Sequence, residues 1–227
     1  MKKQPFYFEI KDTVTQFISA FDDVVISRHN KDRTVDKKLK VRYVYAPKQR
    51  VVHDITNKAK HITLPVIAVS ISSVSRDPGR VFNKIAGSHH PRVDTFAGEQ
   101  ITNNTDFLKS PVPIDIGINM SILTRYQSDM DQILSNFIPY SNPYVVISWT
   151  IPDGVLQQPQ ELRSHVEWSG QINMTYPDTL SSSTQYRVSA DTTFTIKGWL
   201  FKDQSDPSGE IYTVKANFTP VVDIDEY

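Results

Sequence analysis

The sequence predicts an α+β fold in which long, mostly antiparallel strands form a twisted sheet flanked by two main helices. Residues 112–122 alternate strictly between apolar and polar side chains, the pattern of a strand with one buried face. The runs at 162–176 and 186–196 alternate in the same way, and the polar linker between them indicates a hairpin. The main helical patterns lie at about 12–23 and about 125–138.

The helix predicted at 125–138 is amphipathic, because its apolar side chains recur at helical spacing. These side chains are Tyr126, Met130, Ile133, Leu134, Phe137 and Ile138. Thr124 and Gln127 match a capping box at the start of this helix. Pro139 disfavours helical geometry at Ile138, so we expect the helix to end there.

The helix predicted at 12–23 has the same organisation, with Thr13 and Gln16 as its capping box. Its apolar face consists of Val14, Phe17, Ile18 and Phe21. A short strand is expected directly afterwards, at 24–26.

Four further strands complete the predicted sheet. Residues 38–46 alternate as a half-buried strand, whereas 62–74 are apolar on both faces and indicate a central strand that begins with a bulge or an edge at Pro65. The remaining two strands are expected at 145–151 and 212–218. Long paired strands with few helices leave edges outside the core, and such edges are often covered by another subunit, so we expect oligomerisation.

Residues 75–111 are rich in turn signals and show little periodicity. About 37 residues is too long for an ordinary connection, so this long loop is either a flexible insertion or an arm ordered on a neighbouring molecule. The length and composition are those of a globular protein, and we treat residues 1–227 as a single domain.

Charge is distributed unevenly along the chain, although its net charge is zero. Residues 28–50 hold nine basic and two acidic side chains, which makes this run +7 and the remainder −7. The acidic remainder includes Asp223, Asp225 and Glu226. A neutral chain argues against general nucleic-acid binding. The basic run is either a solvated strand face, a docking surface for an acidic partner, or half of a self-association contact.

The sequence nominates no catalytic, metal-binding or cofactor-binding residues. The chain has no cysteine, which excludes disulfides, thiolate catalysis and Cys-ligated zinc. The sequence His165-Val166-Glu167 resembles part of a zinc-deaminase motif, but its alternating context places both polar side chains on the solvent side of a strand. His89 and His90 lack further ligands at a recognisable spacing. No apolar run is long enough to span a membrane and no signal-peptide pattern is visible.

Several segments resemble the proximal tail-sheath stabiliser, or tail-completion, proteins of T-even-type contractile-tailed bacteriophages. The strongest match covers the second predicted helix and its two flanks. It consists of Leu123-Thr124-Arg125-Tyr126, Asp129-Met130, Gln132-Ile133 and Ile138-Pro139-Tyr140. Residues 41–48, 64–83 and 193–199 support it in the same order.

The resemblance implies a non-enzymatic structural protein of the virion. Such proteins form a homohexameric ring at the tail–neck junction, assembled in the host bacterial cytoplasm. The ring caps and stabilises the extended sheath, and its partners are the tail sheath protein, the tail-tube terminator and the neck or head-completion proteins. The resemblance implies no cofactor, no direct nucleic-acid recognition and no membrane.

Other readings stay open from the residues alone. A tail-tube terminator or a head–neck adaptor would form a ring at the same junction. An enzyme using the 75–111 loop as a lid and a carbohydrate-binding receptor module are the alternatives from other classes. As interface candidates the sequence offers basic side chains of the 28–50 run and of the long loop. They are Lys37, Lys38, Lys40, Arg42, Arg76, Arg80, His89, His90 and Arg92.

Overall fold

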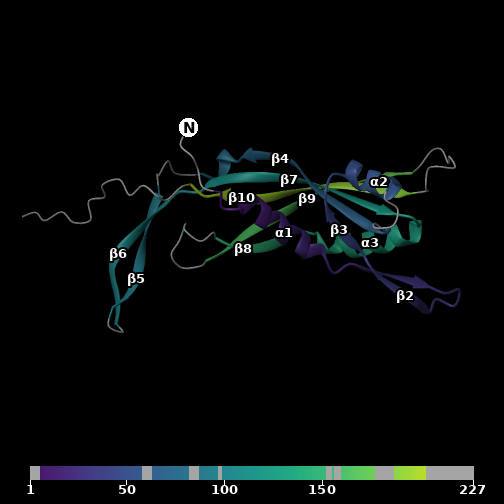
Figure 1. Ribbon diagram of the computed structural model, residues 1–227, viewed down its shortest axis with the longest axis horizontal. Coiled ribbons are helices and arrows are strands. Elements are labelled where there is room, and N and C mark those ends of the chain that lie inside the picture. Colours follow the sequence, from purple (N-terminus) through teal and green to yellow (C-terminus); the bar gives the residue numbers. More distant parts are fainter. Residues whose placement is uncertain are drawn as a thin grey trace, which may run out of the picture.

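The structure is a computed structural model, and it describes residues 6–57, 63–81, 87–96, 99–151, 155, 160–176 and 187–202. The fold is α+β, as predicted, and the described residues form three α-helices and a six-stranded sheet. Figure 1 shows an elongated molecule with a two-stranded projection near each end, the β1–β2 hairpin and the β5–β6 ribbon. No helix within these ranges is both long and apolar enough to cross a membrane.

The elements follow one another along the chain with short connections on the N-terminal side and longer ones after β8. They are α1 (Glu9–Phe21), β1 (Val25–His29), β2 (Val35–Lys40), β3 (Arg42–Tyr45), α2 (Lys48–Asn57), β4 (Val66–Arg76), η1 (Pro78–Arg80), β5 (Gly87–Phe96), β6 (Glu99–Lys109), β7 (Val112–Thr124), α3 (Gln127–Tyr140), β8 (Val145–Thr150), β9 (Glu161–Thr175) and β10 (Val188–Leu200).

The six-stranded sheet has the strand order β3-β4-β7-β10-β9-β8. β3 pairs with β4 in parallel, and every other neighbouring pair in this sheet is antiparallel. The sheet is therefore mixed, and the prediction of a mostly antiparallel sheet requires that correction. β3 and β8 stand at its two edges.

The predicted alternation is confirmed in the centre of the sheet. Every second residue of β7 from Ile114 to Ile122 is buried, and β7 pairs with β10 over the full length of both strands. The predicted hairpin between β9 and β10 is also confirmed, because these strands pair in antiparallel register on the other side of β10.

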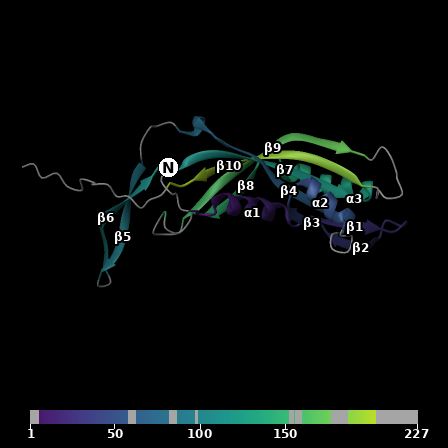
Figure 2. The same ribbon diagram turned by 45° about the horizontal axis from the view of Figure 1, so that its top comes forward.

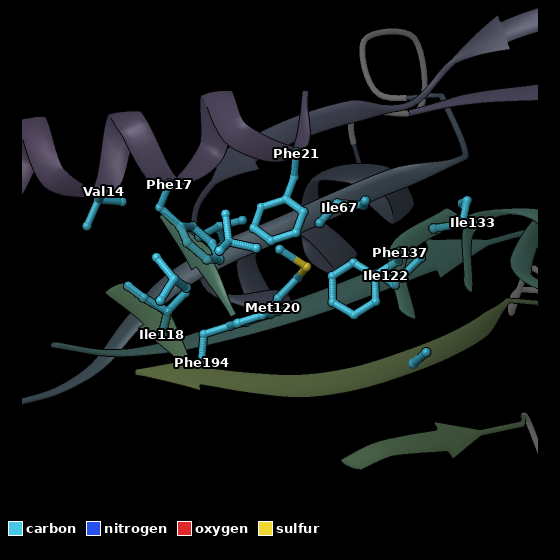
Figure 3. Close-up of a cluster of buried hydrophobic side chains, with 14 of the residues drawn as sticks. Val14, Phe17, Phe21, Ile67, Ile118, Met120, Ile122, Ile133, Phe137 and Phe194 are labelled. Carbon is cyan, nitrogen blue, oxygen red and sulfur yellow. The ribbon is translucent and has the colours of Figure 1, made fainter. Parts of the chain in front are cut away.

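The core lies between the sheet and the two helices that the sequence predicted. Phe17 and Phe21 of α1 and Phe137 of α3 meet Phe194 of β10, with ring centroids 5.2–5.6 Å apart (Figure 3). Met120 lies among these rings in the close-up. Edge-to-face and tilted ring pairs of this kind add to the stabilisation that comes from burying apolar area.

A third helix, α2, covers the opposite face of the sheet and was not predicted. Its only apolar side chains are Val51, Val52 and Ile55 in an otherwise polar segment, which is a weak periodic signal. Val51 and Ile55 are buried and pack in a small cluster with Val66, Ala68 and Leu123.

Both predicted capping boxes are wrong. Thr13 lies inside α1, where its hydroxyl donates to the carbonyl of Glu9 four residues earlier at 2.7 Å. Thr124 is the last residue of β7, paired with Val188, and its buried hydroxyl finds no hydrogen-bond partner among the described residues. The strand pairing therefore continues through the position that the sequence assigned to the cap.

The C-terminal end of α3 also differs from the prediction. Instead of stopping at Ile138, the helix runs through Pro139 to Tyr140. Ser141 closes it, because both its backbone N–H and its hydroxyl donate to the carbonyl of Phe137, at 3.0 and 2.9 Å.

Two strand predictions change in the structure. The single strand predicted at 38–46 is divided at the buried residue Val41. The part before Val41 belongs to β2 in the hairpin, and the part after it is β3 in the main sheet. The segment 75–111 is not a structureless loop, because most of it forms β5 and β6, which pair with each other in antiparallel register. The strand expected at 212–218 lies outside the described residues.

Candidate functional site

The β1–β2 hairpin is the first candidate surface, and it is attached firmly to the body of the molecule. The side-chain amide of Gln132 on α3 bonds to both backbone groups of Ser27, accepting from its N–H at 2.8 Å and donating to its carbonyl at 2.9 Å. The side chain of Ile26 on β1 is completely buried in the core. Arg28 lies 3.6 Å from the buried carboxylate of Asp129.

The basic residues that the sequence selected take different positions around this hairpin. Lys37 and Lys38 are exposed on β2. Lys40 is paired with Asp22 at 3.2 Å, and both side chains stay about half exposed, so this ion pair contributes little to folding. Arg42 opens β3 and is exposed. The hairpin therefore presents much of the basic run to the solvent.

A groove of about 610 Å³ lies where the hairpin joins the main sheet, and we call it the β2–β3 groove. It is lined by Asp22, by residues 38–44 and by residues 63–66. Its walls combine the basic side chains of Lys38, Lys40 and Arg42 with apolar ones. Burial, and secondly the charge of Asp22, raise the pKa of the Tyr43 hydroxyl, so that group stays protonated at any physiological pH.

The β5–β6 ribbon carries His89, His90 and Arg92, all on β5. Its backbone pairs His90 with Asp106 and Arg92 with Asn104, and the register shifts between Arg92 and Asp94. The structure describes the backbone of these residues and not their side chains. Figures 1 and 2 both show the ribbon standing away from the six-stranded sheet.

Arg80 belongs to a charged cluster within the chain, between the end of β4 and the sheet. Its guanidinium donates to Asp77 at 3.0 Å, to Asp115 at 3.1 Å and to the carbonyl of Ile114 at 2.6 Å. It also stacks over the ring of Trp199, 4.9 Å from the ring centroid. The candidate side chain Arg80 is thus engaged inside the molecule, whereas Arg76 is exposed.

The electrostatics of this cluster are mutually supporting. The hydrogen bond with Asp115 raises the pKa of Lys197 despite its partial burial. Desolvation on its own raises the pKa of Asp77, but the N–H of Gly79 and the guanidinium of Arg80 outweigh it and hold that pKa below its ordinary value. The cluster fixes η1 against β7 and β10.

The α2 face of the sheet holds a polar site that the sequence did not reveal. Asp191 accepts from the ammonium group of Lys48 and from the hydroxyl of Ser121, both at 2.5 Å. Lys48 also donates to Ser189 at 3.1 Å. The only signal in the sequence is that these strand residues alternate with the apolar core positions. The network joins α2 to the sheet.

No arrangement of three or more His, Cys, Asp or Glu side chains suited to a metal ion occurs in the described part of the chain. His165 and Glu167 are both exposed on β9, as predicted, and His165 stacks on Tyr144. The candidate sites are therefore surfaces: a basic hairpin with a groove at its base, a projecting ribbon and the edge strands of the sheet.

Comparison with known proteins agrees with a structural role. No curated protein matches the chain. The model of one protein family, described as T4-like virus Myoviridae tail sheath stabiliser, matches residues 6–226. That range covers almost the whole sequence and confirms the resemblance found from the sequence. The chain therefore belongs to the tail sheath stabiliser family of T4-like phages and is a structural protein of a contractile tail.

Proposed function

We propose that the protein forms a homohexameric ring at the head-proximal end of the contractile tail. In this proposal the ring caps the last layer of the extended sheath, sits on the tail-tube terminator and joins the tail to the neck proteins of the head. The observation that carries the proposal is the pair of two-stranded projections near opposite ends of an elongated subunit (Figure 1).

The projections support assembly because of how such structures are stabilised. A two-stranded β-ribbon has little stability of its own in water unless it packs on another element. The β5–β6 ribbon pairs only with itself in the described structure and stands away from the sheet. A neighbouring subunit or a tail protein supplies the missing packing surface.

A closed ring also requires a heterologous interface, in which one patch of a subunit meets a different patch of the next. The molecule has unlike ends, with the basic hairpin near one and the ribbon near the other (Figure 2). In the described structure β3 and β8 stand at opposite edges of the six-stranded sheet, and a strand at an edge can pair with another chain.

Stabilisation of the sheath then follows from preferential binding. A ring that binds the extended sheath more tightly than the contracted sheath shifts the equilibrium toward the extended state. Each subunit contributes to this shift by its difference in binding free energy between the two states. No chemical step is required.

The test uses contractile tails purified without this protein, to which the full chain is added. We expect it to bind at the head-proximal end of the sheath and to raise the fraction of tails that stay extended under a contraction stimulus. Binding to bare tail tubes but not to sheath would identify a tube terminator instead, and binding only to the neck would identify a head–neck adaptor.

The basic hairpin has its own test. Replacing Lys37, Lys38 and Lys40 by Glu reverses the exposed charge of β2 while sparing the core. We expect weaker ring formation or weaker sheath binding with an unchanged fold. Normal rings and normal tail binding by this variant would remove the hairpin from the interface.

A further inference from the structure

We propose that the β2–β3 groove binds residues 219–227 of a second copy of this chain, and so forms one half of the contact between neighbouring subunits. This inference rests on the proposed ring and specifies the two surfaces that meet in it. It follows from the shape and charge of the groove, from the sequence of the segment and from the distance between them.

The groove has the features of a site for an extended, acidic segment. Lys38, Lys40 and Arg42 line it, and among its described lining residues Asp22 alone is acidic, so these residues carry a net positive charge. Apolar and aromatic side chains make up much of the rest, among them Leu39, Tyr43, Val44 and Leu64, and all four are partly exposed.

The groove also runs along a sheet edge. β3 pairs with β4 on one side and is the last strand of the sheet on the other. An edge strand leaves a row of backbone N–H and C=O groups to which an extended segment can add as a further strand. Side-chain pockets beside such an edge then select the sequence of the added strand.

Residues 219–227, Thr-Pro-Val-Val-Asp-Ile-Asp-Glu-Tyr, have the complementary composition. They carry three acidic side chains and no basic one. In an extended conformation Val222 and Ile224 share one face, and Asp223 and Asp225 share the other. The segment therefore pairs apolar side chains with the apolar wall and carboxylates with the basic wall.

Distance favours a second copy over the same chain. The groove lies at the end of the sheet where Val188 pairs with Thr124, whereas β10 ends at Leu200, opposite Val112. β10 has thirteen residues, which corresponds to roughly 40 Å between these ends. Residues 203–218 reach about 55 Å at full extension, so returning to the groove of the same copy would use up about three-quarters of that length in a path back over the body.

A neighbour placed head to tail removes this constraint. It brings the Leu200 end of one subunit near the hairpin end of the next, which is the heterologous geometry of a ring. Opposite charges on the two surfaces then also disfavour head-to-head pairing of two basic hairpins.

Site-specific cross-linking tests the contact, because the chain contains no cysteine and each introduced thiol is unique. One full-length variant carries Thr63→Cys, an exposed residue of the groove, and another carries Ile224→Cys. A short bismaleimide reagent added to the mixed variants should give a covalent dimer. The matched control is Ser169→Cys, exposed on β9, and it should give at least about tenfold less dimer with Ile224→Cys.

Charge reversal tests the chemistry of the contact. Adding Lys38→Glu and Arg42→Glu to the Thr63→Cys copy should lower the dimer yield at least about fivefold. Adding Asp223→Lys and Asp225→Lys to the Ile224→Cys copy should restore it. Equal dimer yields from the groove and control thiols would overturn the proposal. So would dimer yields that stay the same after both sets of charge-reversal substitutions.

A chain that carries both Thr63→Cys and Ile224→Cys distinguishes the two possible sources of the segment. Cross-linking between copies supports the proposal, and a cross-link confined to the monomer at high dilution contradicts it. Electron microscopy of the chain lacking residues 219–227 separates this inference from the ring itself. Unaltered rings would overturn the groove contact and leave the ring proposal standing, whereas a cross-linked contact without sixfold rings would contradict the hexamer alone.

Discussion

The β1–β2 hairpin and the β5–β6 ribbon are both two-stranded, but the interactions found among the described residues secure the hairpin to the rest of the chain and none of them does so for the ribbon. The side-chain amide of Gln132 bonds to both backbone groups of Ser27, and the side chain of Ile26 on β1 is buried in the core. The ribbon pairs only with itself among the described residues and stands away from the six-stranded sheet (Figure 1). The hairpin is therefore a preformed surface, whereas in the proposed ring we expect a partner to pack against the ribbon.

The largest expected effect on the free energy of unfolding comes from a substitution in the core, outside both projections. Phe137→Ala removes a buried ring that contacts Phe21, Trp168 and Phe194, and we expect the free energy of unfolding to fall by about 3–5 kcal/mol. Urea denaturation followed by tryptophan fluorescence measures it. The control is Val35→Ala, an exposed hairpin position, with an expected change within about 0.5 kcal/mol. Equal losses would contradict the assigned core.

The next effect concerns the attachment of the hairpin. Gln132→Leu removes both hydrogen bonds to Ser27 and leaves two backbone groups partly buried and unpaired, which costs about 1–3 kcal/mol. Amide hydrogen exchange should accelerate in β1 and β2 and stay unchanged in β5 and β6. The control is Gln127→Leu, whose side chain donates to the exposed carboxylate of Asp131 on the same helix. If hydrogen exchange accelerated uniformly across the chain, the Gln132 side chain would not be stabilising the hairpin locally.

A smaller effect is expected at the base of the ribbon. Asp115→Asn weakens the ion pairs with Arg80 and Lys197, and because all three side chains are about one-quarter exposed we expect a loss of only about 1 kcal/mol. A double-mutant cycle with Lys197→Met isolates the pair. Additive effects of the two substitutions would mean that Asp115 and Lys197 are not coupled.

Acid should weaken the same cluster. The pKa of Asp77 is lowered in the folded protein, so its ionised form stabilises folding above the ordinary carboxyl pKa of about 4, and this contribution is lost as the pH falls through the lowered value. Denaturation midpoints of the wild type and of Asp77→Asn, compared between pH 5 and pH 3, should converge as the pH drops. A constant difference between them would contradict the assignment.

The smallest effect on folding is expected from the ribbon itself. Replacing residues 87–109 by a short Gly-Ser linker should change the unfolding free energy of the isolated chain by less than about 1 kcal/mol, because the body and its core stay intact. Ring formation and tail binding should be lost. A large loss of stability in the isolated chain would show that the ribbon packs on its own subunit.

The sequence predicted best the elements that pack on their own core. Alternation from Ile114 to Ile122 located β7, and helical spacing located α1 and α3, because burial imposes a period on the chain. Their ends were wrong because strand pairing carries β7 through Thr124 and Ser141 closes α3 beyond Pro139. Local propensity does not report such tertiary interactions.

The surfaces were harder to predict for the same reason. The described backbone of the ribbon pairs only with itself, and the segment 75–111 shows little periodicity, so from the sequence it resembled a loop. Exposed lysines of β2 were visible as a charge run, but the engagement of Arg80 by Asp77 and Asp115 required the geometry. The amide of Gln132 reaching Ser27 across 105 positions of sequence gives no local signal.

Negative-stain electron microscopy of the purified chain, with light scattering on the same sample, tests most directly whether the projections serve contacts between subunits. The account predicts sixfold rings with a mass about six times 25.9 kDa, either free or at the head-proximal end of added tails. The same chain with residues 87–109 replaced should stay monomeric. Rings formed equally by both proteins, or a wild-type monomer that fails to bind tails, would contradict it.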